Sequence, residues 1–329
     1  VPKLEAERRR IDERFDPPRA LAGAARYLAL AQKRFGREDL AVTSYHMGIG
    51  NLEGVIGAYV APKKPARTTR GTVRRYRITY PRLYFDSSPL RNPRTDRRLK
   101  SLDDDSRHYP FRHDASRRIM EDWREDPDAL EQLAEDHTRK ASAEEVLRPE
   151  EDNPPFENDE DLREAYEEGV LLRVPSAPRA LGFRVDKGLG ALARRLEVDK
   201  RLYRGLRPDA LATLLYLSAE VRRISGVERP VVFTSGVRDL PYQRKLTGVN
   251  PQATTGFSLH TTGYAFDLLR PRSRAQHRAI EHVLERLRAL NVLDWVYEPA
   301  AFHATVGEEA EAFAPLLEAL AQGSAPRSP

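Results

Sequence analysis

A proline-rich and strongly charged segment divides this sequence near its middle. Residues 148–155 read Arg-Pro-Glu-Glu-Asp-Asn-Pro-Pro, a composition typical of a linker because proline stiffens the backbone and charged side chains favour water. The length of 329 residues also exceeds what one hydrophobic core usually serves. We therefore expect two domains, residues 1–150 and residues 151–329.

The two halves of the chain differ in their hydrophobic periodicity. Before the linker, apolar residues recur at helical spacing from Pro18 to Phe35 and again from Leu40, which predicts a mostly helical domain. After the linker, helical runs alternate with short apolar runs typical of strands. The expected helices are 210–224 and 274–290, and the expected strands are 230–234, 264–268 and 302–306. We expect an α+β protein whose second domain contains a small antiparallel sheet.

The composition excludes several kinds of site. Cysteine is absent, which excludes disulfides, cysteine-ligated zinc and thiol nucleophiles, so histidine and carboxylate must hold any metal. No apolar run approaches the roughly 20 residues of a transmembrane helix. The excess of five basic over acidic residues favours an anionic polymer as partner, and nucleic acid, teichoic acid and peptidoglycan all meet this description.

One decapeptide in the second half points to a metal site. Residues 258–267 read Ser-Leu-His-Thr-Thr-Gly-Tyr-Ala-Phe-Asp, and His303 follows 36 residues after Asp267. On a strand over 264–268, Asp267 shares a face with a small residue, and Gly263 permits a tight entry that lets His260 fold back to the same side. Two imidazoles and a carboxylate are three ligands for a catalytic zinc and leave a fourth position for water. An isolated histidine in a strand is more often an ordinary imidazole than a ligand, but the joint pattern favours the metal.

The decapeptide matches Ser-x-His-x-x-Gly-x-Ala-x-Asp, the signature of the D-Ala-D-Ala carboxypeptidase family of zinc peptidases, whose superfamily includes the Hedgehog signalling domain. Upstream, residues 234–239 and 242–243 resemble that family's Ser-Gly-x-Arg segment and the glutamine after it, and the resemblance covers about residues 205–307. It implies an α+β zinc peptidase domain and Zn²⁺ as cofactor. The ligands that it implies are His260, Asp267 and His303.

The same resemblance implies roles for further residues. Arg238 is expected to hold substrate and to stabilise the developing oxyanion, because its planar charged fork matches carboxylate and carbonyl oxygens. The residues expected to bind substrate are Ser235, Gln243 and Ser258. The expected general base is Glu298, which would take a proton from water and deliver it to the leaving amine. Glu298 lies five residues before His303, whereas the family's glutamate lies three before, so a solvated loop residue is the alternative interpretation.

The N-terminal half resembles a different family. Residues 15–28 and 44–51 are similar to the Ala-Gly-x-x-Tyr-Leu helix and the Ala-Tyr-Asn-Ala-Gly-x-Gly segment of lysozyme-like lytic transglycosylases, within about residues 12–57. Tyr45 is expected to contact a saccharide, and His46 stands where that family has asparagine. The family cleaves glycan strands with a glutamate before this helix. Because Glu5 and Glu7 lack the expected surroundings, we expect that the catalytic glutamate is missing and that the domain is partial.

Together these features predict a zinc metallopeptidase that hydrolyses peptidoglycan stem peptides, as a D,D- or L,D-carboxypeptidase or endopeptidase, fused to a lobe that cleaves or binds glycan. Two alternatives stay open: a zinc-containing wall-binding protein without catalysis, and a lytic transglycosylase that its C-terminal domain only positions.

The expected partner is peptidoglycan rather than nucleic acid, in an extracytoplasmic location. No signal peptide is visible and the chain begins without methionine, so we expect processing or a fragment. The scissile bond and the oligomeric state stay open.

Overall fold

The computed structural model describes residues 2–61, 68–102, 104–139, 147–175, 182–250 and 253–321. The chain forms two compact units, Val1–Glu125 and Asp126–Pro329. None of the helices in this described part is long and apolar enough to cross a bilayer.

The boundary predicted at residue 150 therefore lies inside the second unit, and long-range contacts of Arg148 explain the difference. Arg148 Nε donates to the Val306 carbonyl at 3.1 Å and Nη2 donates to the Gly307 carbonyl at 3.2 Å. Its guanidinium carbon also lies 3.6 Å from the ring centroid of Tyr264. A segment with the composition of a linker is thus bound to the body of the second unit.

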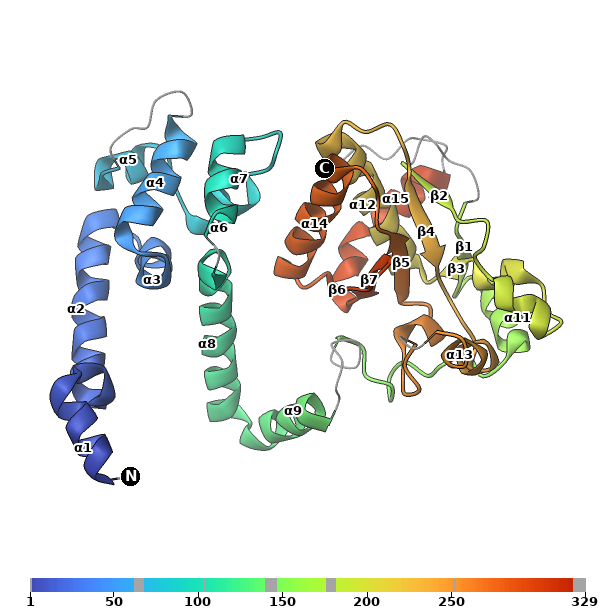
Figure 1. Cartoon of the computed structure of the whole chain (residues 1–329), viewed down its shortest axis with the longest axis horizontal. Helices are drawn as coiled ribbons and strands as arrows, with labels where there is room; N and C mark the ends of the chain where they lie inside the picture. The colour runs from blue at the N-terminus through green and yellow to red at the C-terminus, as the bar shows by residue number, and fades with distance from the viewer. Residues whose placement is uncertain are drawn as a thin grey trace. The chain divides into compact units, whose positions relative to one another are not determined.

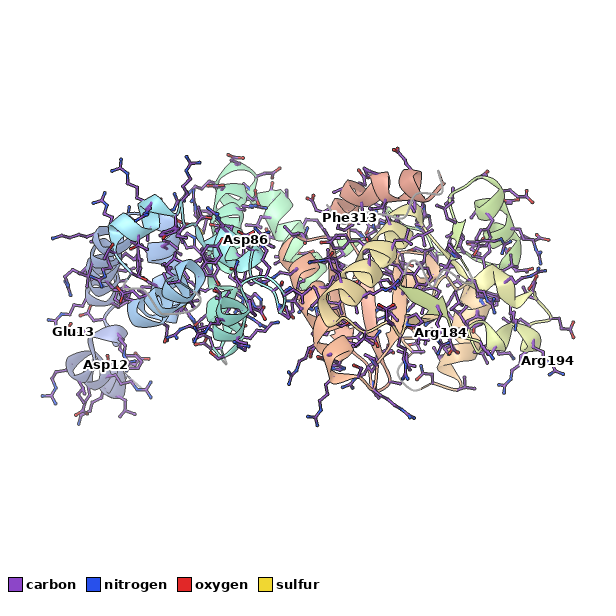
Figure 2. All side chains as sticks on the ribbon, turned by 90° about the horizontal axis from the view of Figure 1, so that it is seen from above. Asp12, Glu13, Asp86, Arg184, Arg194 and Phe313 are labelled. Carbon is purple, nitrogen blue, oxygen red and sulfur yellow. The ribbon has the colours of Figure 1, made fainter. Side chains whose placement is uncertain are left out.

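The first unit is built from helices, shown in blue to green in Figure 1. They are α1 (Pro2–Ile11), α2 (Pro17–Phe35), α3 (Glu38–Met47), α4 (Ile49–Val60), α5 (Arg70–Arg75), α6 (Tyr80–Phe85), α7 (Pro93–Lys100) and α8 (Tyr109–Glu125). The predicted helix over 18–35 is confirmed as α2, which begins after the capping carboxylate of Asp16 and ends at Gly36 with φ of 75°. Polar contacts tie the helices together: Tyr27 donates to the Ser44 carbonyl at 2.6 Å. Asp86, labelled in Figure 2, accepts from the Tyr59 hydroxyl at 2.7 Å.

The second unit combines helices with two sheets. The helices are α9 (Pro127–Arg139), α11 (Asp159–Glu167), α12 (Pro208–Ser225), α13 (Leu240–Thr247), α14 (Arg274–Ala289) and α15 (Ala314–Ala321). A five-stranded sheet has the order β2-β4-β5-β7-β6, and a smaller sheet pairs β1 with β3. The strands are β1 (Leu172–Arg173), β2 (Phe183–Val185), β3 (Gly205–Leu206), β4 (Val231–Ser235), β5 (Ala265–Leu269), β6 (Leu293–Tyr297) and β7 (Ala301–Val306).

The α+β class is confirmed, but the main sheet is mixed rather than antiparallel. β2 pairs in parallel with β4, because the chain between them passes through α12 and returns in the same direction, as a parallel connection requires. The pairs β4–β5, β5–β7 and β6–β7 are antiparallel, as expected.

One face of the main sheet is apolar and the other carries the candidate site. Phe266 and Phe302 belong to a buried cluster together with side chains of α12 and α14. Successive side chains of a strand point to opposite faces of the sheet. Because these two rings face the helices, Asp267 and His303 face the opposite side. The helices therefore supply the hydrophobic core, and the far face is left for polar chemistry.

Candidate metal centre

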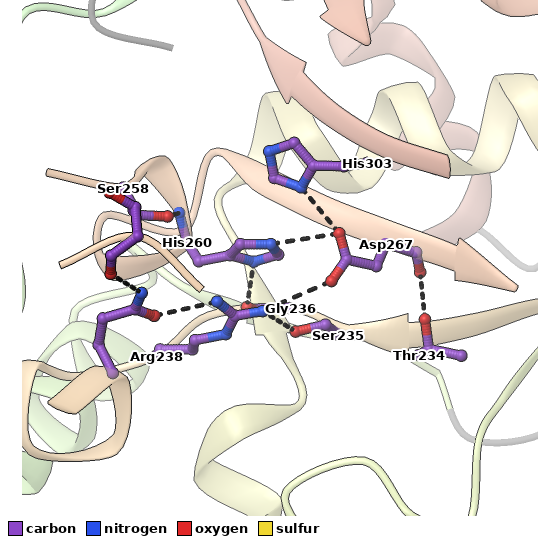
Figure 3. A network of polar contacts seen from close by, with 10 residues as sticks. Thr234, Ser235, Gly236, Arg238, Ser258, His260, Asp267 and His303 are labelled. Atoms are coloured by element: carbon purple, nitrogen blue, oxygen red, sulfur yellow. Dashed lines mark hydrogen bonds and ion pairs between the residues drawn. The ribbon is translucent and has the colours of Figure 1, made fainter. Parts of the chain in front are cut away.

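The register of β5 and β7 brings the first two predicted ligands together. Asp267 pairs directly with His303 in this antiparallel ladder, so the two side chains lie on the same face of the sheet. His303 Nδ1 lies 2.8 Å from Asp267 Oδ1, and this contact is visible in Figure 3. Both residues are 7% exposed. A pairing across 36 residues of sequence thus brings together two of the three candidate ligands.

His260 reaches the same place from the loop before β5. It lies in the short 3-10 helix Leu259–Thr261, which Ser258 caps by accepting from the His260 amide at 3.4 Å. Gly263 then reverses the chain with φ of +87°, and an added Cβ would lie 2.8 Å from Leu171 Cδ2, so a side chain there would strain the backbone and displace Leu171. As a result, His260 Nε2 lies 3.3 Å from Asp267 Oδ1.

The three side chains have the geometry and the chemistry of a metal site. One potential ligand atom from each of His260, Asp267 and His303 lies within 4.8 Å of the others, and all three residues are buried. His260 Nδ1 lies 2.8 Å from the Gly236 carbonyl; donation to this oxygen orients the ring and leaves Nε2 as the ligand atom, as such outer contacts do in metal proteins. Nitrogen and carboxylate oxygen are donors that zinc accepts. The residues present therefore fit the predicted ion.

Electrostatics favours the protonation states that bind metal. Burial lowers the pKa of His260, and the nearby Arg238 lowers it further. Burial alone would raise the pKa of Asp267, but the attraction and hydrogen bonding of His260 and His303 outweigh it and hold the pKa well below its usual range. A neutral imidazole and an ionised carboxylate are the forms that coordinate a cation.

Arg238 lies beside this cluster and is fixed by two of the predicted substrate-binding residues. Its Nη2 donates to Ser235 Oγ at 2.8 Å and its Nη1 donates to Gln243 Oε1 at 3.0 Å. Nη2 also lies 3.4 Å from Asp267 Oδ2. The structure thus places Ser235 and Gln243 as supports of the guanidinium, and it places Ser258 as the buried cap of the His260 turn.

Glu298 lines the same cavity as Arg238 and Asp267. The cavity has a volume of about 220 Å³. The Glu298 amide donates to the Ala301 carbonyl at 3.0 Å, which closes the hairpin between β6 and β7 around two residues. Val296 pairs with His303, and strand alternation continues the metal-site face from Val296 to Glu298. The hairpin therefore accommodates the spacing of five residues.

Several further cavity residues were given no role from sequence, among them Leu189, Tyr203 and Asn250, and Tyr242 was included in a family segment without a role. The two tyrosine rings lie 4.3 Å apart, centroid to centroid, and Tyr203 donates to Asp239 Oδ2 at 3.1 Å. These residues have no sequence motif of their own. The feature of the sequence that could have pointed to Tyr203 is its partner Asp239, which directly follows Arg238.

Tyr45 belongs to the first unit and lies on α3 with 47% of its surface exposed. Its ring packs edge-on against Tyr27 at 5.6 Å and stacks near Tyr109 at 6.5 Å. The adjacent His46 stacks on Tyr109 at 4.9 Å, and its Nδ1 lies 2.8 Å from Ser106 Oγ. The arrangement offers an exposed aromatic face of the kind that sugars stack on.

A scan against protein-family models matched residues 3–66 to the transglycosylase SLT domain. This confirms the lysozyme-like resemblance of the N-terminal part and extends it at both ends. Neither the curated proteins nor the solved structures contain a match. The match lies wholly in the first unit and does not reach the second unit, so no comparison bears on the cluster of His260, Asp267 and His303.

Proposed function

We propose that the chain acts on peptidoglycan and that its second unit is a zinc peptidase that hydrolyses bonds in the stem peptides. The observation that carries this proposal is the convergence of His260, Asp267 and His303 beside a cavity lined by Arg238 and Glu298. Burying so many polar groups is costly unless they are paired or bind a ligand. The peptidoglycan substrate follows from the family match of the first unit.

Each residue has a definite task in such a reaction. Zinc, when bound, supplies a Lewis acid that polarises the scissile carbonyl and makes water a stronger acid. Glu298 takes a proton from the attacking water and passes it to the leaving amine, so an amide and water become a carboxylic acid and an amine. Arg238, oriented by Ser235 and Gln243, binds a substrate carboxylate or the oxygen that becomes negative.

The proposal is tested by zinc content and by digestion of muropeptides. We expect one zinc per chain and release of amino acids or peptides, detected by mass spectrometry. Glu298→Gln removes the base but preserves shape, so activity should fall by about 100-fold to 10,000-fold while zinc is retained. Glu308→Gln is the matched control, because Glu308 is exposed and is not part of the cavity lining. Absence of zinc binding after careful zinc addition would refute the peptidase.

The unusual spacing between Glu298 and His303 supports an alternative, in which the protein binds zinc but does not catalyse hydrolysis. In that case zinc binds, muropeptides bind, and no product forms under any condition. Full activity of Glu298→Gln would instead assign the base to another residue.

The family match favours a second function, action of the first unit on the glycan strand itself. The exposed ring of Tyr45 and the neighbouring Tyr109 supply a stacking surface for sugars. Glu5 and Glu7 both lie exposed on α1. Incubation of the chain with purified glycan strands distinguishes cleavage of the glycan from binding alone. Anhydro-sugar products would assign cleavage to the first unit, whereas binding without products would assign it a targeting role.

A further inference from the structure

The hairpin between β6 and β7 carries Glu298, and its first strand packs against α14 (Figure 1). The loop that follows Glu298 consists of Pro299 and Ala300. A general base works only within hydrogen-bond reach of the proton that it takes, whereas loop residues are ordinarily more mobile than the strands they join. The position of Glu298 therefore depends on what holds this hairpin in place.

Tyr297 directly precedes Glu298 and lies on the opposite face of the sheet. It pairs with Phe302 across the β6–β7 ladder, and the two ring centroids lie 5.3 Å apart. Phe302 is fully buried in the core on the helix side. Because side chains alternate along a strand, a contact that fixes the Tyr297 ring also fixes the strand end from which Glu298 projects into the cavity.

A hydrogen bond links the Tyr297 ring to α14. Its hydroxyl donates to Oε1 of Glu281 on this helix. Partial burial raises the pKa of Tyr297, and the hydrogen bond to Glu281 raises it further, so the hydroxyl keeps its proton at neutral pH. A hydrogen bond to an ionised acceptor is stronger than one between neutral groups. The end of β6 is thus tied to the helix that covers the sheet.

Arg270, in the connection between β5 and α14, contacts both the ring and the loop. Its guanidinium carbon lies 5.1 Å from the Tyr297 ring centroid, a favourable cation–π distance. Its Nη1 donates to the Pro299 carbonyl at 3.4 Å, and its amide donates to the Ala300 carbonyl at 2.9 Å. Arg270 therefore contacts the chain on both sides of Glu298, including the stretch that lengthens the spacing to the candidate ligand on β7.

We propose that Tyr297 is a positioning residue for the base: held by Glu281 and Arg270, it fixes the end of β6 so that Glu298 stays directed into the cavity. The inference rests on the proposed function, in which Glu298 takes a proton from water. It adds that contacts outside the metal centre take over the placement of a base whose spacing to His303 is unusual. The role of Tyr297 is indirect, since its ring lies on the helix side of the sheet.

The test measures hydrogen exchange in the full chain, without and with zinc, and muropeptide turnover with zinc. Tyr297→Ala should speed exchange of the amides in 296–302 by at least about tenfold, because the hairpin then opens more easily. The kcat should fall by at least about tenfold while KM and zinc affinity stay constant, since a small displacement of a reacting group lowers turnover. Tyr297→Phe keeps the ring beside Arg270 and loses the bond to Glu281, so its effects should be smaller.

A double substitution separates positioning from a general loss of structure. If Tyr297 acts through Glu298, then Tyr297→Ala should change turnover little in a chain that already carries Glu298→Gln, because two changes to one interaction do not add. Tyr216→Phe is the matched control, since it makes the same change on α12, where the ring stacks on Phe313 at 4.6 Å. It should behave like the unmodified chain, and circular dichroism checks that every variant is folded.

The outcomes are distinct. Faster exchange together with a lower kcat that is absent in the Glu298→Gln background supports the inference. Unchanged exchange in Tyr297→Ala overturns it whatever the turnover, and so does a fall in kcat that adds in full to that of Glu298→Gln. If the unmodified chain releases no product, or if Glu298→Gln is fully active, the proposed role of Glu298 fails and the inference falls with it; these two results are seen before any Tyr297 variant is measured.

Discussion

The two units of this chain give evidence of opposite kinds. The first unit matches a known family over residues 3–66, yet Tyr45, the side chain expected to contact sugar, lies exposed on one helix. The second unit gathers three buried candidate ligand side chains and a fixed arginine beside a cavity, outside the residues of that match. The proposed polymer substrate rests on similarity, and the proposed chemistry rests on geometry. Substitutions that reduce the binding or activity of one unit, while the other unit is left unchanged, show whether the two units contribute to the same function.

The largest effect is expected from removing a ligand in the second unit. His260→Ala leaves two ligand side chains, so zinc affinity should fall by more than about 100-fold, beyond what loss of an outer contact costs. Titration against a competing chelator measures it. His277→Ala is the matched control, because this imidazole pairs with Glu281 on α14, away from the cluster. Equal zinc binding by both variants would place the ion elsewhere.

A loss of turnover with zinc binding retained is expected from replacing the cation beside the candidate metal centre. Arg238→Lys keeps the charge but cannot contact Ser235 and Gln243 together, so peptidase turnover should fall by about 100-fold to 1,000-fold, as for loss of an oxyanion donor. The assay is muropeptide release at saturating zinc. Arg184→Lys, at an exposed position of β2, should behave like the unmodified chain. Unchanged turnover in Arg238→Lys would remove this residue from the reaction.

Gly263→Ala tests how the metal loop is held. The positive φ costs about 1–3 kcal/mol for a residue with a side chain, and the contact with Leu171 adds to it. Gly169 also has a positive φ, of 76°, but a Cβ there meets nothing within 4 Å. Chemical denaturation should therefore show a larger loss of stability for Gly263→Ala than for Gly169→Ala. Equal losses would mean that backbone strain alone matters.

The smallest effect is expected in the first unit. Tyr45→Ala should weaken binding of glycan strands by about threefold to tenfold, because aromatic contacts contribute about 0.5–1.5 kcal/mol. Tyr76→Ala removes another exposed tyrosine, 42% exposed and outside the Tyr27–Tyr45–Tyr109 group, and should change nothing. Pull-down with purified glycan measures both, and peptidase activity on soluble muropeptides should stay constant. A loss of peptidase activity in Tyr45→Ala would show that the two units are coupled.

The grouping of His260, Asp267 and His303 could be predicted because a family signature identifies these residues and the strand pattern shows which face of the sheet they share. Strand periodicity places Asp267 and His303 on the polar face, and a glycine before the strand indicates a reversal that returns His260. Less could be predicted where contacts are distant. His46 meets Ser106 across 60 residues, and no spacing rule connects them. The three residues of β2 are too few for a periodicity signal, so the parallel pairing that makes the sheet mixed was not expected.

The Arg148 contacts determine where the second unit can be separated from the first. A fragment that starts at residue 151 would expose the Tyr264 ring and leave the Val306 and Gly307 carbonyls without their donor. It would keep Phe156, whose amide donates to the Thr261 carbonyl at 2.8 Å, one residue after the candidate ligand His260. The segment that reads as a linker thus carries contacts of the second unit, and a fragment designed to test zinc binding has to begin before it.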